Sequence, residues 1–334
     1  MKKRIAINGF GRIGRTFLRT LLLDSKAIEQ IDVIAINIGP GDPNLIAQLF
    51  KYDSTLREYK GTVEYKNGYL DINGYKIKIL NKLDPSQINW KELNIDWVVE
   101  SSGKFTSKEK AEIHIKSGCK KVLITAPAQN EDITIIPGVN DEQYNNSKHN
   151  IISLGSCTAN CFAPMVKIIK ETFGLEAGLM TTIHAYTNDQ VLLDIEHKDP
   201  RRARAAALNI IPTKTGADKV IIKIYPELEG KIKAKSIRVP TPVVSIVDFT
   251  FTTKEDLTSD KVNNAFKKHS QTTLKGILQY CTQPLVSSDF MQNTHSAVLD
   301  SLLTECVGNM CKVFAWYDNE FAYCCRLKDF LLHI

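Results

Sequence analysis

The chain has 334 residues, with 43 Lys and Arg against 37 Asp and Glu, and a formal net charge of +6. This length suggests two domains, and the 43% apolar and 24% charged composition excludes fibrous and low-complexity classes. No apolar run reaches the roughly 18 residues of a membrane-spanning helix. The basic start Met1–Arg4 lacks the apolar stretch of a secretory signal. We therefore expect a cytoplasmic protein with no membrane partner.

The first half of the chain alternates strand and helix patterns. Short apolar strands are predicted at 4–8, 32–37, 97–99, 121–125 and 151–154, with helices after the first glycine-rich turn and at 107–117. Strands that alternate with helices favour an α/β fold with a parallel, doubly wound sheet.

The second half has a different texture. Residues 243–253 alternate between apolar and polar side chains, which is typical of a strand with one covered face in an antiparallel or mixed sheet. This half is therefore predicted to be α+β. The last stretch, Tyr323–Ile334, is helical and apolar in pattern, and we expect it to dock onto the body of the protein.

The turn after the first strand carries three glycines, Gly9-x-Gly11-x-x-Gly14. Glycines at this spacing let the backbone approach a pyrophosphate, whose charge then lies at a helix N-terminus. A strand before and a helix after favour dinucleotide binding over a merely structural turn. The acidic residue expected after the second strand is replaced by Ile38, and Asp42 is a weak substitute beyond a Gly-Pro-Gly turn.

The eight cysteines are too few for a disulfide scaffold and lack the paired Cys-x-x-Cys spacing of structural zinc. We expect no metal and a reducing compartment. Cys157 follows a predicted strand and opens a predicted helix, whose N-terminus favours a reactive thiolate over a thiol. Cys161, four residues later, is expected to be packed, although Cys157-x-x-x-Cys161 also fits a disulfide.

At these residues the chain resembles phosphorylating glyceraldehyde-3-phosphate dehydrogenases, and the resemblance covers essentially its whole length. Several stretches carry it in family order: Ile7–Arg15, Lys51–Ser54, Ser156–Cys161, Thr182–Gln190, Arg201–Ala207, Pro212–Gly216, Arg238–Pro242 and Trp316–Glu320.

The resemblance assigns roles to individual residues. Cys157 matches the nucleophile and His184 its histidine partner, which without the flanking match would be read as an ordinary strand histidine. Cofactor binding is implied for Gly9, Gly11, Arg12, Ile13, Gly14 and Asn319. Thr187, Asp189 and Arg238 match the pocket for the substrate's C3 phosphate, where we expect Asp189 to orient Arg238. Ser156, Thr158, Thr215 and Gly216 match the site for inorganic phosphate.

The resemblance also implies an architecture and partners. Residues 1–155, completed by the helix at 320–334, form a Rossmann-type NAD(P)-binding domain, and residues 156–319 form a catalytic domain with a large mixed sheet. The implied ligands are NAD, glyceraldehyde 3-phosphate and inorganic phosphate, and the implied assembly is a homotetramer. The basic run Arg201-Arg202-Ala203-Arg204 lies in the expected interface loop, and no nucleic acid is expected as primary ligand.

Three departures from the family pattern concern the cofactor. Ile38 replaces the usual acidic residue, Leu83 replaces an arginine, and Ile195-Glu196 replaces Leu-Pro. We expect an NAD enzyme with weakened discrimination against NADP, in which Glu196 of a neighbouring subunit supplies part of the preference. Lys82 is the nearest candidate cation for a 2′-phosphate.

Two alternatives are weighed against this interpretation. Erythrose-4-phosphate dehydrogenase, the sister enzyme, departs from the motifs that contain Thr187, Asp189, Thr215 and Gly216, which are intact here. A non-catalytic nucleotide- or RNA-binding protein on the same scaffold should have lost Cys157 or His184, and both are present.

Overall fold

The computed structural model describes residues 2–334, which divide into two compact units. Residues 2–135, 142–155 and 324–334 form the first unit, and residues 136–141 and 156–323 form the second. The chain enters the second unit briefly at residues 136–141, leaves the first unit again after Gly155 and returns to it within the last helix, at Cys324.

The first unit is built on a largely parallel sheet. Among the described residues this sheet has nine strands in the order β3-β4-β5-β2-β1-β6-β7-β9-β8. The strands are β1 (Lys3–Asn8), β2 (Ile31–Asn37), β3 (Val63–Lys66), β4 (Tyr69–Ile72), β5 (Tyr75–Leu80), β6 (Trp97–Glu100), β7 (Lys121–Ile124), β8 (Ile133–Thr134) and β9 (Ile151–Ser153). The antiparallel pairs are β3–β4 and β4–β5 at one edge, so β4 runs opposite to its neighbours.

Strand order reverses between β1 and β6, because β2 lies on one side of β1 and β6 on the other. In open parallel sheets, ligands bind at the carboxyl ends of the strands at such a switch point. The predicted doubly wound, Rossmann-type sheet is therefore confirmed, and its switch point lies beside the glycine-rich turn.

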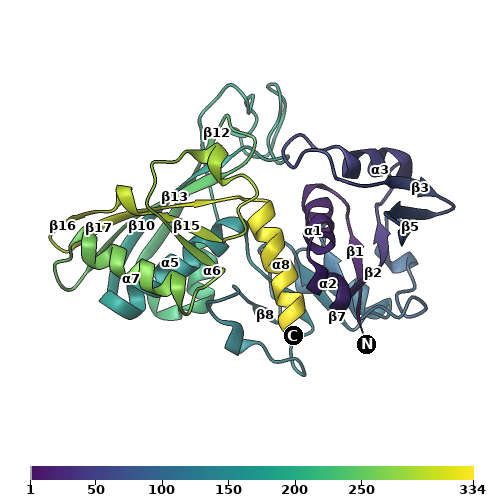
Figure 1. Ribbon diagram of the computed structural model, residues 1–334, viewed down its shortest axis with the longest axis horizontal. Helices are drawn as coiled ribbons and strands as arrows, with labels where there is room; N and C mark the ends of the chain where they lie inside the picture. Colours follow the sequence, from purple (N-terminus) through teal and green to yellow (C-terminus); the bar gives the residue numbers. More distant parts are fainter. Residues whose placement is uncertain (1) are drawn as a thin grey trace. The chain divides into compact units, whose positions relative to one another are not determined.

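Helices cover both faces of this sheet (Figure 1). They are α1 (Arg12–Leu22), α2 (Ser25–Gln30), α3 (Pro43–Lys51), α4 (Lys108–Lys116) and, from Cys324 onward, α8 (Phe321–His333). On one face Ala6 and Val98 pack with Ala111 of α4. On the other, the Trp97 ring meets Phe330 of α8 edge-on at 6.0 Å. The C-terminal helix docks as predicted.

The second unit has a mixed sheet. Its described strands run in the order β11-β12-β10-β13-β17-β15-β14, with β16 paired to β17. They are β10 (Leu175–Ala185), β11 (Ile211–Thr213), β12 (Ile232–Val239), β13 (Ser245–Thr253), β14 (Leu278–Cys281), β15 (Ala297–Asp300), β16 (Glu305–Val307) and β17 (Met310–Tyr317). The β10–β12 and β14–β15 pairs are parallel, and the other pairs are antiparallel.

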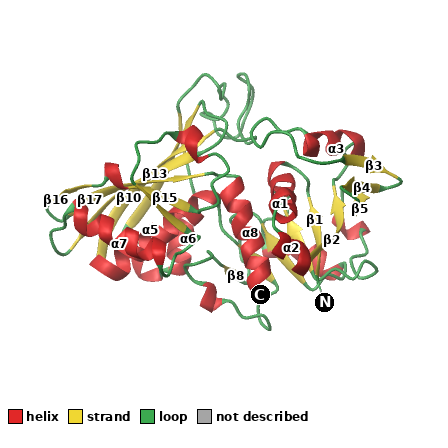
Figure 2. Ribbon diagram, in the orientation of Figure 1, coloured by secondary structure: helices red, strands yellow, loops and turns green. Residues whose placement is uncertain are grey.

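Three helices, α5 (Cys157–Phe173), α6 (Ala217–Ile224) and α7 (Ser259–Gln271), lie together on one face of this sheet (Figure 2). Val247, Phe249 and Phe251 of β13 are buried toward them, as the alternating pattern predicts. The rings of Phe162 in α5 and Phe249 meet edge-on at 4.8 Å. This core fixes the start of α5 relative to the ends of the central strands. Short 3-10 turns are found at Pro85–Gln87, Asp141–Gln143, Pro226–Leu228, Ser287–Phe290 and Ser301–Leu303.

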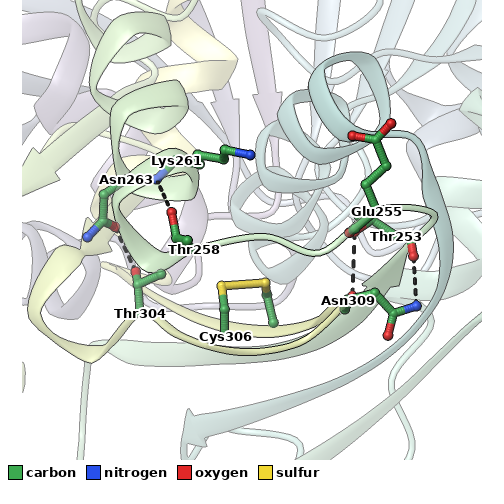
Figure 3. The surroundings of a disulfide bond; sticks show 9 residues. Thr253, Glu255, Thr258, Lys261, Asn263, Thr304, Cys306 and Asn309 are labelled. Atoms are coloured by element: carbon green, nitrogen blue, oxygen red, sulfur yellow. Dashed lines mark hydrogen bonds between the residues drawn. A yellow bond between two sulfur atoms is a disulfide. The ribbon is translucent and has the colours of Figure 1, made fainter.

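A disulfide joins Cys306 and Cys311, which face each other across the β16–β17 hairpin (Figure 3). Cys157 and Cys161 are both free thiols, so the alternative of a bond between them is wrong. The cysteine spacing alone does not predict the hairpin bond, although the Gly308-Asn309 dipeptide between two strands is a hairpin signal. The nearby Asn309 amide donates to the Thr253 carbonyl at 2.8 Å and ties the turn to β13.

Replacing both Cys306 and Cys311 with alanine is expected to lower the free energy of unfolding by about 2 kcal/mol, because a bond that closes a short loop restricts the unfolded chain. Denaturant titration of the two proteins measures the difference. A thiol reductant should lower the midpoint of the parent to that of the double variant and leave the variant unchanged. A parent that is insensitive to reductant would contradict this role.

Candidate active site

Cys157 is the first residue of α5 and lies two residues after Gly155, whose positive φ of 62° glycine adopts without strain. Ser156 caps the helix, because its Oγ accepts a hydrogen bond from the Ala159 N–H at 3.1 Å. The first turn of the fully described α5 carries no acidic side chain. The partial positive charge of the helix N-terminus is therefore unopposed near the Cys157 thiol.

His184 lies one residue before the end of β10 and is buried. Its Nε2 is 3.6 Å from the Cys157 Sγ, so the predicted thiol–imidazole pair is formed by two elements of the same unit. Cys161, by contrast, is fully buried in the core, with its Sγ 3.7 Å from the Ala315 carbonyl. Of these two cysteines, only Cys157 lies beside a base.

Arg238 joins this pair from the neighbouring strand. The parallel register of β10 and β12 pairs His184 with Arg238. Arg238 Nη1 lies 2.7 Å from His184 Nδ1 and 3.0 Å from the Ala185 carbonyl oxygen. The Arg238 Nε is buried and has no hydrogen-bond partner in the described part of the chain. The guanidinium therefore retains capacity to bind an anion.

Two contacts compete for His184 Nδ1, which either donates to the Ala185 carbonyl or accepts from Arg238 Nη1. The Ala185 carbonyl oxygen lies 2.6 Å from Nδ1 and can accept a hydrogen bond from it. Arg238 Nη1 can donate to the same carbonyl. With the hydrogen on Nδ1, the lone pair of Nε2 points toward the Cys157 thiol, which is the arrangement that a general base requires.

Burial governs the protonation of both partners. It raises the pKa of the Cys157 thiol, while the Arg238 charge and hydrogen bonds from Thr158 act in the opposite direction. Burial and the Arg238 charge together lower the pKa of His184 from 6.5 to about 3. Burial therefore favours the neutral forms of both groups and opposes the effect expected from the helix N-terminus.

Tyr317 holds the two catalytic elements together. Its hydroxyl lies 2.9 Å from Thr158 Oγ1 on α5 and 2.7 Å from Thr182 Oγ1 on β10, and all three groups are buried. The bond thereby fixes the start of α5 against the end of β10. Sequence reasoning missed this role, although Tyr317 stands inside the Trp316–Glu320 motif.

The glycine-rich turn of the first unit fits a dinucleotide. A Cβ on Gly9 would lie 2.4 Å from the Ser102 backbone nitrogen, and one on Gly14 would lie 2.4 Å from the Gly9 carbonyl oxygen. A Cβ on Gly11, the N-cap of α1, would meet no atom within 4 Å. The turn therefore packs tightly against the protein at Gly9 and Gly14 and leaves open space before the helix N-terminus, as pyrophosphate binding requires.

Segments in both units match models of known protein families. Residues 3–108 match the glyceraldehyde 3-phosphate dehydrogenase NAD binding domain, and residues 156–319 match the C-terminal domain of the same enzyme family. The chain belongs to the glyceraldehyde 3-phosphate dehydrogenase family. The family match includes the residues of the thiol–imidazole pair.

Curated relatives are similar to this chain over its full length. The chain is 49% identical to glyceraldehyde-3-phosphate dehydrogenase 2 of Bacillus subtilis, over 100% of this chain and 97% of the relative. It is 48% identical to glyceraldehyde-3-phosphate dehydrogenase 2 of Streptomyces avermitilis and 46% identical to the Geobacillus stearothermophilus enzyme, covering 100% of this chain and 99% and 98% of the relatives.

One expected role among the residues matched to this family is wrong. Asp189 does not hold Arg238; its carboxylate forms an ion pair with Arg202. Arg202 also donates through Nε to Thr213 Oγ1 at 2.9 Å and lies 3.6 Å from the Asp199 carboxylate. Arg202 thus joins the loop after β10 to β11. Arg238 instead donates to the Ala185 carbonyl on the adjacent strand, where it also lies beside His184.

The remaining predicted residues are placed as follows. Thr158 bonds Tyr317, and Thr215 Oγ1 accepts from the Ala217 N–H at 3.3 Å at the start of α6, where Gly216 is the N-cap. Within residues 2–334 no hydrogen bond links Thr215 or Gly216 to Ser156 or Thr158.

Asn319 and Arg12 are each held by nearby side chains. Ser245 donates to Asn319 Oδ1 at 3.3 Å and accepts from the Ala185 N–H at 3.0 Å, which ties Asn319 to the end of β10. In the first unit, Arg12 donates to Asp53 at 2.8 Å and to Thr55 at 2.7 Å. Burial would raise the pKa of Asp53, but hydrogen bonds from the Leu56 N–H and Arg12 lower it to about 2.

Within residues 2–334, no group of three or more His, Cys, Asp or Glu side chains is arranged so that it could hold a metal ion. The helices in this range are all too short or too polar to cross a bilayer.

Proposed function

We propose that the chain catalyses the reversible oxidative phosphorylation of D-glyceraldehyde 3-phosphate to 1,3-bisphosphoglycerate, with NAD as the oxidant. The observation that carries this proposal is the 3.6 Å contact between the Cys157 thiol and His184, with Arg238 beside it. A soft nucleophile, a base and a cation for a phosphate are what this reaction needs from the protein. Cofactor binding is assigned to residues 1–155 with 320–334, and catalysis to residues 156–319.

Cys157 and His184 perform the covalent steps. The Cys157 sulfur adds to the aldehyde carbon, and the thiol proton passes by way of His184 Nε2 to the carbonyl oxygen, which gives a hemithioacetal. His184, once it is neutral again, accepts the hydroxyl proton of the hemithioacetal during its oxidation to a thioester. The backbone N–H of Cys157 and the imidazole stabilise the oxyanion. Inorganic phosphate then attacks the thioester carbonyl, and the Cys157 thiolate leaves.

The oxidation needs a two-electron acceptor, and NAD, when bound, supplies this chemistry by accepting hydride. The open space at Gly11 and the free N-terminus of α1 would hold its pyrophosphate. Arg12, Ile13 and Asn319 are proposed as further contacts. For specificity we propose NAD with weakened discrimination against NADP, because Ile38 offers no carboxylate to a ribose hydroxyl and Glu196 would act only from a neighbouring subunit.

Two separate anion sites are proposed. Arg238 and Thr187, with Asp189 acting through Arg202, would take the C3 phosphate of the substrate. Inorganic phosphate would be held by the helix N-termini and hydroxyls of two segments, which are Ser156–Thr158 and Thr215–Gly216. Phosphate-dependent reduction of NAD by the purified protein with D-glyceraldehyde 3-phosphate tests the function. D-Erythrose 4-phosphate as the better substrate would favour the sister enzyme.

The two anion sites are expected to separate in mutant kinetics. Arg238→Ala removes a charged hydrogen-bond donor and should raise the KM for the triose phosphate by about 10- to 150-fold. Thr215→Ala removes a neutral donor and should raise the KM for inorganic phosphate by about 2- to 10-fold. Initial rates across both substrate concentrations measure these effects. If either variant raised the KM of both substrates equally, the assignment of two separate anion sites would be wrong.

We also propose a cytoplasmic homotetramer. Support comes from large apolar side chains exposed on the loop between β10 and β11, an arrangement typical of a subunit interface. They are Leu192, Leu193, Ile195, Leu208 and Ile210, each at least 65% exposed. Arg204 pairs with Asp194 on the same loop at 2.7 Å. Sedimentation equilibrium measures the assembly, and a monomer at micromolar concentration would contradict it.

A further inference from the structure

The amino ends of the central strands of the first unit surround a hollow of about 1130 Å³, which we call the basic hollow. It lies at the edge of the sheet opposite to the glycine-rich turn, because β1 begins at Lys3 and the turn follows its last residue, Asn8. Residues near both ends of the chain meet there, where Lys3 Nζ donates to the Ile334 carbonyl at 2.6 Å (Figure 1). Since cofactors of open parallel sheets bind at the carboxyl ends of the strands, the basic hollow is separate from the nucleotide site.

The charge of the lining is strongly unbalanced. Among the described residues that line the basic hollow, two are acidic, Glu29 and Asp96, and six are cationic. Asp96 pairs with Lys120 Nζ at 2.7 Å, and Arg4 Nη1 lies 4.0 Å from the Asp32 carboxylate outside the lining. The cationic residues without a carboxylate partner in the described part of the chain are Lys2, Lys3, Lys91 and Lys121.

Two of these four lysines are held by neutral oxygens. Lys3 Nζ donates to the Leu331 and Ile334 carbonyls, and Lys121 Nζ donates to the His149 carbonyl at 2.6 Å. Burial lowers the pKa of both lysines, while Asp96 acts in the opposite direction on Lys3 and Asp132 on Lys121. A carbonyl satisfies a hydrogen bond but does not cancel a charge, so an anion in the basic hollow would stabilise both ammonium groups.

The other two lysines have exposed and unoccupied side chains. Within residues 2–334 neither the Lys2 nor the Lys91 ammonium group forms a hydrogen bond or an ion pair. The backbone at Lys91 is nevertheless fixed, because the Lys91 carbonyl accepts from the Asn94 N–H at 3.0 Å. A Cβ on Gly118 would lie 2.6 Å from the Lys91 Cβ, so Lys91 stands directly against the turn before β7. Both side chains are therefore available to a ligand in the basic hollow.

The spacing of the fixed cations indicates an extended anion. Strand β6 lies between β1 and β7 in the sheet, so the strands that begin at Lys3 and Lys121 are two strand spacings apart, or about 10 Å. A single phosphate cannot contact both lysines, whereas a linear chain of phosphates can. Trp97 is the one aromatic residue among the described lining residues and is only 4% exposed, so it offers no face on which nucleic acid bases could stack.

We infer that the basic hollow binds a triphosphate group, with Lys3 and Lys121 as fixed cations and Lys2 and Lys91 as mobile ones. The ligand is a free oligophosphate or the phosphate chain of a nucleoside triphosphate, which present the same chemistry to the protein. Lysine binds phosphate as a point charge and needs no particular orientation of the chain. The inference is independent of the proposed oxidation, because it uses neither the thiol–imidazole pair nor the two proposed anion sites.

Calorimetry on the whole protein, with NAD present in excess so that the nucleotide site is filled, measures the binding of inorganic tripolyphosphate, orthophosphate and ATP. We expect tripolyphosphate to bind at least about 10-fold tighter than orthophosphate, and this advantage to shrink as salt rises. Equal affinities for the two would overturn the inference. ATP as the tighter ligand would identify a nucleoside triphosphate as the source of the phosphate chain, and tripolyphosphate as the tighter ligand would identify a free oligophosphate.

The double variant Lys2→Glu/Lys91→Glu should weaken tripolyphosphate binding by at least about 10-fold, because two cations at the site become anions. Both side chains are unbonded in the described structure, so the variant should fold, which thermal unfolding checks. Lys78→Glu/Lys110→Glu is the matched control, because it makes the same change of net charge at exposed lysines outside the basic hollow. It should change the affinity less than about twofold.

Three results would overturn the inference. Equal weakening by the two double variants would show that only the net charge of the protein attracts the anion. Weakening by Arg238→Ala in place of Lys2→Glu/Lys91→Glu would show that tripolyphosphate binds at the anion sites of the second unit. Tighter binding of a single-stranded oligothymidylate that also depends on Lys2 and Lys91 would show that the basic hollow is a nucleic acid site.

Discussion

Cys157→Ser is expected to lower kcat for phosphorylating oxidation by at least about 1,000-fold, the scale on which loss of a catalytic nucleophile acts. In the same position beside His184, a serine hydroxyl would ionise far less readily than the Cys157 thiol. The ester that it would form is also a poorer acyl donor to phosphate than a thioester. Steady-state rates at saturating substrates measure the loss, and calorimetry should show nucleotide binding to the first unit unchanged.

Cys161→Ser is the matched control, because it makes the same chemical change four residues along the same helix. Cys161 is fully buried and away from the imidazole, so a modest loss of stability with most of the kcat retained is expected. If Cys161→Ser were inactive while Cys157→Ser kept more than a few per cent of the parent rate, the nucleophile would be misassigned.

His184→Asn is expected to reduce kcat by about 100- to 10,000-fold, the usual contribution of a positioned general base. The pH profile distinguishes this role from a structural one. Because the pKa of His184 is lowered to about 3, the imidazole stays neutral through the acid range, and the parent should show no loss of activity centred near pH 6.5. Its activity should instead rise toward alkaline pH, since burial raises the pKa of the Cys157 thiol.

In His184→Asn the thiol must lose its proton to solvent, so the residual rate should climb more steeply with pH than that of the parent. His269→Asn, a partly exposed histidine on α7, should leave both the rate and the profile unchanged. A parent profile with an acidic limb at the pKa of an ordinary histidine would show that His184 titrates freely, and would contradict its assignment as a buried neutral base.

The sequence predicted what depends on local pattern. Glycine spacing identified the turn at Gly9–Gly14, alternation identified β13, and the strand-to-helix junction placed Cys157 at the start of a helix. The tighter contacts at Gly9 and Gly14 and the open position at Gly11 agree with the physical reasons given for that spacing. Such features are readable because one short segment contains all the residues that determine them.

Contacts between distant segments were not readable in the same way. Nothing local indicates that Asp189 pairs with Arg202 or that Tyr317 bridges Thr158 and Thr182, since these depend on how β10, β17 and α5 pack. The surroundings of the Cys157 thiol were also only partly readable. A helix N-terminus is visible in sequence, whereas the desolvation that opposes its effect depends on the complete core.

The contact between Arg238 and His184 has a consequence for which aldehydes can react. While the guanidinium stands 2.7 Å from the imidazole, its charge opposes formation of the imidazolium ion. A phosphate bound to Arg238, as proposed for the C3 phosphate, would neutralise that charge and make His184 a stronger base. An aldehyde without a phosphate would leave the base weakened even after reaching Cys157. The protein would then select phosphorylated aldehydes through kcat as well as through binding affinity. The substrate's own phosphate would activate His184, the base that accepts the hydroxyl proton of the hemithioacetal.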